Sequence, residues 1–264
     1  MIKLNGQVVE FSHFNDGTCR IVLSPPFTPA RVIWLYDNDE EIVQIMYLIS
    51  HLKAHHCDVR LRMPFMPNAR QDRVHSAEDV FTLKYFCRLL NSLSLDEIEI
   101  FDPHSHVCEA LLDNVVVRTP SAILQNLLAD VLPPDIHICY PDTGAEHKYS
   151  TMLQRPYVTG VKQRDFATGK IQSYELLGEV HDYPFLIIDD IIGKGNTVYL
   201  AAQELKAAGA NDIYVYASHV ENTIFQPLPC GQSLIEVPNL ITKIYTTNSI
   251  YRGNNNKIEV IKYF

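Results

Sequence analysis

The stretch FLIIDDIIGKGNT occupies residues 185–197 and decides the fold of the chain. It predicts a buried strand over 185–188, two adjacent acids, a loop of small residues, and a helix over 197–208. Gly209 stands where a glycine that ends a helix belongs. A strand that leads through a short loop into a helix is the unit from which parallel α/β sheets are built.

The same alternation runs outward from this stretch in both directions. Further strands are predicted over 31–36, 58–63, 97–101, 136–140 and 213–217, and further helices over 41–55, 77–93 and 121–131. Residues 1–23 are predicted as a hairpin around Asn15-Asp16-Gly17, and the polar residues 160–183 as a mobile loop. We therefore expect an α/β protein with two domains, 1–119 and 120–264, each a mostly parallel sheet flanked by helices.

Composition bounds the class of protein. The chain has 264 residues, of which 47% are hydrophobic and 20% charged, so it is long enough and apolar enough to bury a core. Its net charge of −9 argues against a general nucleic-acid-binding surface but permits a local basic site. The sequence has no membrane-spanning apolar run and no signal peptide, and its six dispersed cysteines are typical of reduced thiols. We expect a cytoplasmic protein without membrane or nucleic-acid partners.

The acids and glycines of residues 185–197 have a direct chemical use. Carboxylates at the carboxyl end of a strand can hydrogen-bond the vicinal hydroxyls of a sugar. Glycines allow backbone N–H groups to approach an anion, and Thr197 can donate to a phosphate at the start of the helix. The competing interpretation is a tight turn capped by Asn196 or Thr197. The loop is not a Walker A motif, because Lys194 is followed by Gly195.

Four other segments carry candidate chemistry, each with a plain structural alternative. Residues 60–73 hold four arginines and one aspartate, which suits polyphosphate oxygens or a solvated loop. His104 follows a predicted strand and is a candidate metal or phosphate contact, although a lone histidine there more often does neither. Asp142 also follows a strand and suits either water-mediated Mg²⁺ binding or an Asx-turn. Lys162 and Arg164 lie in the predicted loop, where they either close over a reacting phosphate or are simply solvated.

Taken in this order, the segments resemble the ribose-phosphate pyrophosphokinases. The most specific matches are ARQDR at 69–73 and IDDII at 188–192, supported by YPD at 140–142 and TNSI at 247–250. The resemblance implies a tandem of two phosphoribosyltransferase-like domains. It also implies an enzyme that transfers the β,γ-diphosphate of Mg-ATP to the anomeric hydroxyl of ribose 5-phosphate and releases AMP. Mg²⁺ and ATP are therefore the expected cofactor and co-substrate.

The resemblance also implies a role for each matching residue. The implied ATP-binding residues are Phe14, Asp16, Arg70, Gln71, Arg73 and His104. Of these, Phe14 and Asp16 lie in the predicted hairpin and would reach a neighbouring subunit's site in a homo-oligomer. The implied ribose and phosphate contacts are Asp189, Asp190, Gly193, Lys194, Gly195, Asn196 and Thr197. The implied catalytic residues are Lys162, Arg164, Arg73 and His104, and the implied Mg²⁺ ligands are His104, Asp142 and Asp189.

The chain departs from the family pattern at three places. The family loop reads Asp-Thr-small-Gly-Thr, whereas residues 193–197 read GKGNT, which makes the loop more cationic by two charges. This change motivates a second hypothesis, in which the acceptor is a 5-substituted ribose, notably ADP-ribose, giving ADP-ribose pyrophosphate for NAD salvage. Thr18 replaces a glutamate that would contact adenine, and the family's C-terminal helix has no counterpart, which favours a smaller oligomer. A non-catalytic regulatory homologue and an ordinary phosphoribosyltransferase are the alternatives from other functional classes.

Overall fold

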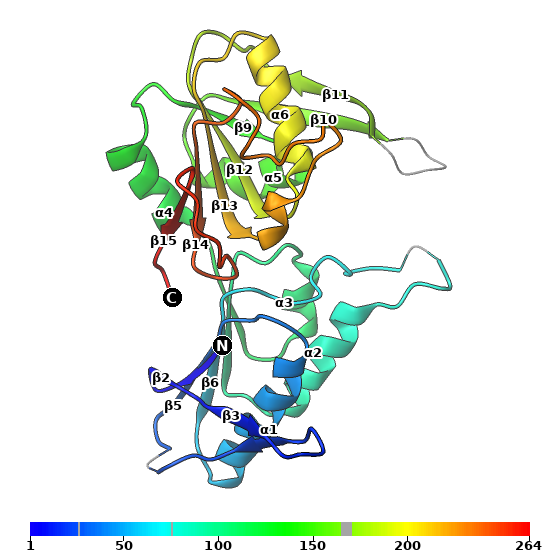
Figure 1. Cartoon of the computed structure of the whole chain (residues 1–264), viewed down its shortest axis with the longest axis vertical. Helices are drawn as coiled ribbons and strands as arrows, with labels where there is room; N and C mark the ends of the chain where they lie inside the picture. The colour runs from blue at the N-terminus through cyan, green and yellow to red at the C-terminus, as the bar shows by residue number, and fades with distance from the viewer. Residues whose placement is uncertain (26, 75, 165–170) are drawn as a thin grey trace. The chain divides into compact units, whose positions relative to one another are not determined.

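The computed structural model of the chain describes residues 1–25, 27–74, 76–164 and 171–264. The chain divides into two compact units, Met1–Thr119 and Pro120–Phe264. Each unit is built on one largely parallel sheet with helices packed on it (Figure 1), so the predicted α/β fold class is confirmed.

The first unit contains a six-stranded sheet in the order β2-β1-β5-β6-β7-β8. Strands β5 to β8 are parallel, and β1 pairs antiparallel with both β2 and β5. The sheet strands are β1 (Ile2–Leu4), β2 (Gln7–Val8), β5 (Ala30–Trp34), β6 (Val59–Met63), β7 (Glu97–Phe101) and β8 (Val115–Arg118). The helices are α1 (Glu40–Ala54), α2 (Thr82–Ser92) and α3 (Val107–Leu111), and a separate hairpin pairs β3 (Phe11–His13) with β4 (Cys19–Ile21).

Alternation along β5 and β6 buries one face of this sheet. Val32 and Leu61 are buried in the same hydrophobic cluster as Leu48 of α1. The alternate residues of these strands point to the other face, where Nε of Arg62 lies 2.6 Å from Oε1 of Glu99. Arg60 likewise faces a glutamate of β7. The sequence grouped these two arginines with a phosphate-binding segment, and the structure instead pairs them with acids across the sheet.

The second unit contains a seven-stranded sheet in the order β11-β10-β9-β12-β13-β14-β15. All neighbouring pairs are parallel except β10 with β11. The strands are β9 (His137–Tyr140), β10 (Tyr157–Arg164), β11 (Ile171–Leu177), β12 (Phe185–Ile192), β13 (Ile213–Val220), β14 (Lys243–Thr247) and β15 (Ile258–Ile261). The helices are α4 (Ser121–Asn126), which continues as a π-helical turn over Leu127–Val131, α5 (Thr143–Tyr149) and α6 (Asn196–Ala207), with short 3₁₀ turns at Ser150–Met152 and Asn222–Phe225.

Three sequence predictions need correction. Within residues 160–183, predicted as a mobile loop, residues 160–164 and 171–177 form the antiparallel hairpin β10–β11, in which Val161 pairs with Glu175 and Lys162 with Tyr174. The part of that prediction on residues 165–170 lies outside the described residues. Strand β12 continues through both acids to Ile192, so Asp189 and Asp190 lie within the strand and not after it. Helix α2 begins at Thr82, five residues later than predicted.

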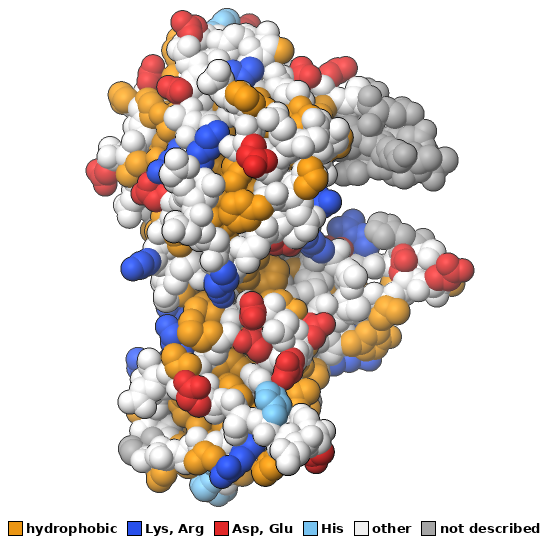
Figure 2. Space-filling model, in the orientation of Figure 1, with side chains coloured by type: hydrophobic (Ala, Val, Ile, Leu, Met, Phe, Trp, Pro, Cys, Tyr) orange, Lys and Arg blue, Asp and Glu red, His pale blue; other side chains and the backbone are white. Residues whose placement is uncertain are grey.

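Among the described helices, none is both long and apolar enough to cross a membrane. Figure 2 shows acidic and basic side chains interspersed with apolar ones over the face in view.

Candidate active site

The carboxyl ends of three adjacent strands bring the polar residues of the second unit together. Strands β10, β9 and β12 are neighbours and run parallel, so the segments that follow them meet at one edge of the sheet. Hydrogen bonds link three predicted site residues at this edge, Asp142, Lys162 and Thr197, and a fourth, Asp189, interacts electrostatically with Asp142 and Lys162.

Asp142 caps the amino end of helix α5. Its Oδ1 accepts a hydrogen bond of 3.0 Å from the backbone N–H of Ala145, so the Asx-type interpretation holds for this oxygen. Its Oδ2 accepts a second bond of 2.8 Å from the ammonium group of Lys162. Burial alone would raise the pKa of Asp142, but these two hydrogen bonds hold it below the usual value. Asp142 is therefore an oriented carboxylate anion at neutral pH.

The side chain of Lys162 is largely buried and hydrogen-bonds to two other residues of the site, so it is not simply solvated. Its side chain is only 11% exposed, and besides Asp142 it donates a bond of 3.2 Å to Oγ1 of Thr197. Thr197 therefore does not cap helix α6, whose N-cap is Gly195 with no side-chain hydrogen bond. Gly195 has a φ of +89°, and a Cβ there would lie 2.5 Å from Leu234, so only glycine fits this turn.

The neighbouring acids of β12 differ in their surroundings. The backbone N–H of Asp190 donates a bond of 2.9 Å to Oδ1 of Asp189. Burial and, to a smaller extent, the nearby charges of Asp190 and Asp142 together raise the pKa of Asp189 to about 8. Like charges gathered in this way create a position at which a cation is stabilising.

One charged residue of the site was missed by the sequence analysis. Nζ of Lys148, in helix α5, lies 3.2 Å from Oδ2 of Asp190, and both side chains are largely buried. As a basic residue in the last turn of a short helix, Lys148 looks like an ordinary solvated cation in the sequence. Its partner is 42 residues away, so the sequence pattern has no local signal for this pair.

A tyrosine fixes the hairpin that carries Lys162. Tyr174 is the direct cross-strand neighbour of Lys162, and its hydroxyl donates a bond of 3.0 Å to the carbonyl of Pro141. A Cβ at Gly160 would lie 2.0 Å from that hydroxyl oxygen, so glycine is needed for the contact. The hairpin is thus bonded to two adjacent residues, to Pro141 through Tyr174 and to Asp142 through Lys162. The side chain of Arg164 lies outside the described part of the structure.

A second group of predicted residues meets at the carboxyl ends of the first unit's strands. Nε of Arg73 lies 2.7 Å from Oδ1 of Asp72, while its own side chain is 68% exposed. The hydrogen bond from Arg73 lowers the pKa of Asp72, and a bond from Ser105 and the charge of His104 act in the same direction. The ARQDR segment and the turn after β7 therefore lie together, with Arg73 and His104 both exposed.

The remaining predicted residues are exposed. Arg70 and Gln71 lie on the surface, and the hydroxyl of Thr82 donates to Oε1 of Gln71. Phe14 is 55% exposed at the tip of the β3–β4 hairpin. Asp16 accepts bonds of 2.9 and 2.7 Å from the backbone and hydroxyl of Thr18, so the residue that departs from the family pattern stabilises the turn.

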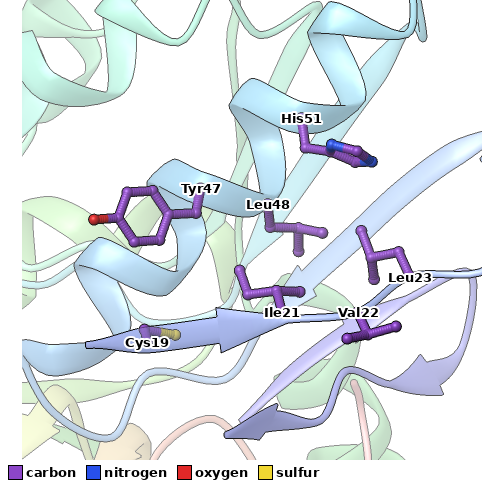
Figure 3. Close-up of a pocket in the computed structure, with 7 residues that line it drawn as sticks. All are labelled: Cys19, Ile21, Val22, Leu23, Tyr47, Leu48 and His51. Atoms are coloured by element: carbon purple, nitrogen blue, oxygen red, sulfur yellow. The ribbon is translucent and has the colours of Figure 1, made fainter. Parts of the chain in front are cut away.

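The pocket of Figure 3 lies elsewhere in the first unit. It has a volume of about 460 Å³ and is enclosed between strand β4 and helix α1, with Ile21, Leu23 and Leu48 among its apolar walls. The rest of its lining is Cys19, Val22, Tyr47 and His51. It offers few polar groups, in contrast to the charged strand ends, so we place the candidate chemistry at the latter.

The donor chemistry of the second unit fits a magnesium ion that is shared with a phosphate ligand. No group of three or more His, Cys, Asp or Glu side chains within the described ranges is arranged to hold a metal. Mg²⁺, however, is usually held by one or two carboxylates together with substrate phosphates and water. Asp142 and Asp189 supply such carboxylates, and the mutual repulsion that raises the pKa of Asp189 is the feature that a cation would relieve.

The comparisons with known proteins agree on one family. Ribose-phosphate pyrophosphokinase 2 of Enterococcus faecalis is 25% identical over 262 residues, which cover 94% of this chain and 78% of the relative. The ribose-phosphate pyrophosphokinase of Staphylococcus saprophyticus is 26% identical over 262 residues, with 94% and 79% coverage. No protein-family model matches the chain.

A solved structure shows the same fold. The phosphoribosylpyrophosphate synthetase of Mycobacterium smegmatis superposes with a TM-score of 0.78 at 20% identity, over 96% of this chain and 85% of that chain. The fold is therefore shared across nearly the whole chain, and the family resemblance predicted from the motifs is confirmed.

Proposed function

The chain is a homologue of the ribose-phosphate pyrophosphokinases over 94% of its length, and from this premise we propose that it is an ATP-dependent pyrophosphokinase. In the proposed reaction the anomeric oxygen of a ribose 5-phosphate-type acceptor attacks the β-phosphorus of ATP. The bond from that phosphorus to the oxygen of the α-phosphate breaks, AMP leaves, and the hydroxyl proton passes to solvent. The product is a ribose 5-phosphate that carries a diphosphate on its anomeric carbon.

The arrangement of Lys162 between Asp142 and Thr197 is the single observation that carries this proposal. Its ammonium group is held at the edge of the sheet beside Asp189 and the loop 193–197. A cation fixed there can stabilise the charge that develops on the transferred phosphates, and a fixed cation needs little reorganisation during the reaction. Lys162 is therefore the proposed catalytic cation of the second unit, with Arg164 as its proposed partner.

The remaining roles follow the same division. We assign Asp189 and Asp190 to the ribose hydroxyls, and loop 193–197 with the start of helix α6 to the 5-phosphate. The proposed ATP contacts, assigned by homology, are Phe14, Asp16, Arg70, Gln71, Arg73 and His104. Mg²⁺ would neutralise phosphate charge, and its proposed ligands are Asp142 and Asp189 in the second unit and His104 in the first. The protein's own share is to orient the acceptor hydroxyl in line with the β-phosphate.

A 5-substituted ribose is the second candidate acceptor. Lys194 is exposed in the turn that begins helix α6, at the position where the predicted loop gains positive charge. An added cation there favours an acceptor with more than one phosphate at its 5-position, such as ADP-ribose. The product would then be ADP-ribose pyrophosphate, and the reaction would serve NAD salvage.

An acceptor screen tests both proposals at once. ATP labelled in the β-phosphate is incubated with Mg²⁺ and either ribose 5-phosphate or ADP-ribose, and AMP release and product mass are followed. AMP that forms only when an acceptor is present supports the pyrophosphokinase and excludes a non-catalytic homologue. Release of AMP with neither acceptor, or of ADP in its place, would contradict the proposed reaction. A strong preference for ribose 5-phosphate would exclude ADP-ribose as the natural acceptor.

The contribution of a neighbouring subunit stays a prediction. If Phe14 and Asp16 reach the site of another copy, a mixture of Phe14→Ala and Lys162→Ala proteins should regain activity that neither variant has alone. Sedimentation of the wild-type protein gives the oligomeric state. A monomer, or mixtures without any regained activity, would contradict the exchange.

A further inference from the structure

Lys148 is a charged residue beside the acid pair that the proposed reaction has not yet used. It lies on helix α5, whose amino end is capped by Asp142, so both ends of this short helix face the site. Its Nζ is 3.2 Å from Oδ2 of Asp190, and the two side chains are only 13% and 9% exposed. A lysine and an aspartate that are both so well shielded from water hold each other in one geometry.

The two lysines of the site divide the carboxylates between them. Lys162, on β10, contacts Asp142, whereas Lys148, on α5, contacts Asp190. Asp189 interacts electrostatically with one carboxylate of each pair, since the charges of Asp142 and Asp190 both raise its pKa. Removal of Lys148 would take away the 3.2 Å contact to Asp190. The side chain of Asp190 would then be free to turn away from its present orientation.

We propose that Lys148 is a positioning residue for the acceptor: it holds the Asp190 carboxylate in the orientation in which Asp189 and Asp190 together receive two neighbouring ribose hydroxyls. Two carboxylates on adjacent residues of a strand start from opposite faces of the sheet. The contact from Lys148 of α5 fixes where the Asp190 carboxylate lies relative to that of Asp189. This inference rests on the proposed function, because it takes the ribose of the acceptor as the ligand of the acid pair.

The alternative is that Lys148 only balances a buried charge and stabilises the fold. The two roles differ in what a substitution changes. A purely structural role alters the free energy of unfolding and lowers the amount of active protein, which leaves the KM of each substrate unaltered. A positioning role raises the KM of the acceptor selectively, because ATP has its proposed contacts in the first unit. Arginine at position 148 should restore the positioning role, since it can still donate to Asp190.

The experiment compares Lys148→Met, Lys148→Arg and a matched control, Lys53→Met. Lys53 forms a lysine–aspartate pair with Asp96 in the first unit, whereas the acid pair belongs to the second. AMP release is measured with ribose 5-phosphate varied at saturating ATP, and the reverse. We expect Lys148→Met to raise the acceptor KM about tenfold or more, with the ATP KM within about twofold. Lys148→Arg should recover most of the loss, and Lys53→Met should leave both constants unchanged.

A double-mutant cycle keeps the proposal testable if Lys148→Met does not fold. Lys148→Met is introduced into Asp190→Asn, which lacks the charge that Lys148 balances. If Lys148 acts through Asp190, the added substitution should leave the acceptor KM of Asp190→Asn within about twofold. An independent loss in that background would overturn the proposal, as would a folded Lys148→Met protein with an unchanged acceptor KM. Calorimetric binding of ribose 5-phosphate is measured alongside. A wild-type protein that binds this sugar but releases no AMP would refute the proposed function alone, and weaker binding by Lys148→Met would still support the positioning role.

Discussion

Substitution of Asp189 by asparagine should stabilise the metal-free protein while it weakens acceptor binding. Burial and the charges of Asp190 and Asp142 raise the pKa of Asp189 to about 8, so folding disfavours its ionised form. Asparagine is similar in size, cannot ionise, and can still accept the 2.9 Å bond from the backbone N–H of Asp190. The cost of taking up a proton at this position on folding is therefore removed without loss of that hydrogen bond.

The magnitude follows from proton linkage. A carboxyl whose pKa is higher in the folded state is most favourable to folding at low pH, and its contribution is lost as the pH rises towards the folded pKa. With an unfolded pKa of 3.8 and a folded pKa of about 8, the cost at pH 7 is on the order of a few kcal/mol, and it is smaller at pH 5. The advantage of Asp189→Asn over the wild type should thus grow between about pH 4 and 8 and level off above that range.

The assay is urea denaturation without divalent cations, followed by circular dichroism at several pH values. Asp190→Asn is the matched control, because its carboxylate is already paired with Lys148 at 3.2 Å. Loss of that partner should lower the free energy of unfolding, the opposite sign to Asp189→Asn. An Asp189→Asn protein that is no more stable than the wild type at pH 7, or whose advantage does not change with pH, would refute the reasoning. Its acceptor KM should rise in the same preparations, as expected where a functional charge is kept at a cost in stability.

Three further substitutions test other parts of the site. Lys162→Ala should lower kcat by about 10² or more with little change in the ATP KM, since the cation acts on developing charge; an equal loss of ATP affinity would contradict this role. Gly160→Ala should lower the free energy of unfolding by about 1–3 kcal/mol, because its Cβ would lie 2.0 Å from the Tyr174 hydroxyl; Tyr174→Phe, which loses only a hydrogen bond, should cost less when both are measured by urea denaturation. Lys194→Thr should reduce the ratio of kcat/KM for ADP-ribose to that for ribose 5-phosphate. Lys206→Thr, at the other end of helix α6, is its control, and an unchanged ratio in Lys194→Thr would count against the second acceptor.

Residues whose surroundings are local were predicted well from the sequence. The apolar run before Asp189 and the small residues after Ile192 predict a buried strand and a turn into a helix, so this part of the sheet follows from short-range patterns. For Asp142, the Asx-turn alternative agrees with the bond that its Oδ1 accepts from Ala145, although the helix that this bond caps was not predicted. These predictions needed no knowledge of where distant segments lie.

Lys162 and Lys148 show why the rest of the site could not be predicted in the same way. The hairpin that carries Lys162 is polar along much of its length. Its first strand, β10, is stabilised by pairing with β11 and β9, and a polar sequence does not predict this pairing. Lys148 was missed because its contact with Asp190 spans 42 residues and depends on how α5 packs against β12. Sequence patterns therefore identify which chemical groups are available, whereas the pairing of acids with bases is set by the sheet order β10-β9-β12. Since that pairing lowers the pKa of Asp142 while burial and nearby charges raise the pKa of Asp189, the different roles of these two carboxylates are a property of the tertiary fold.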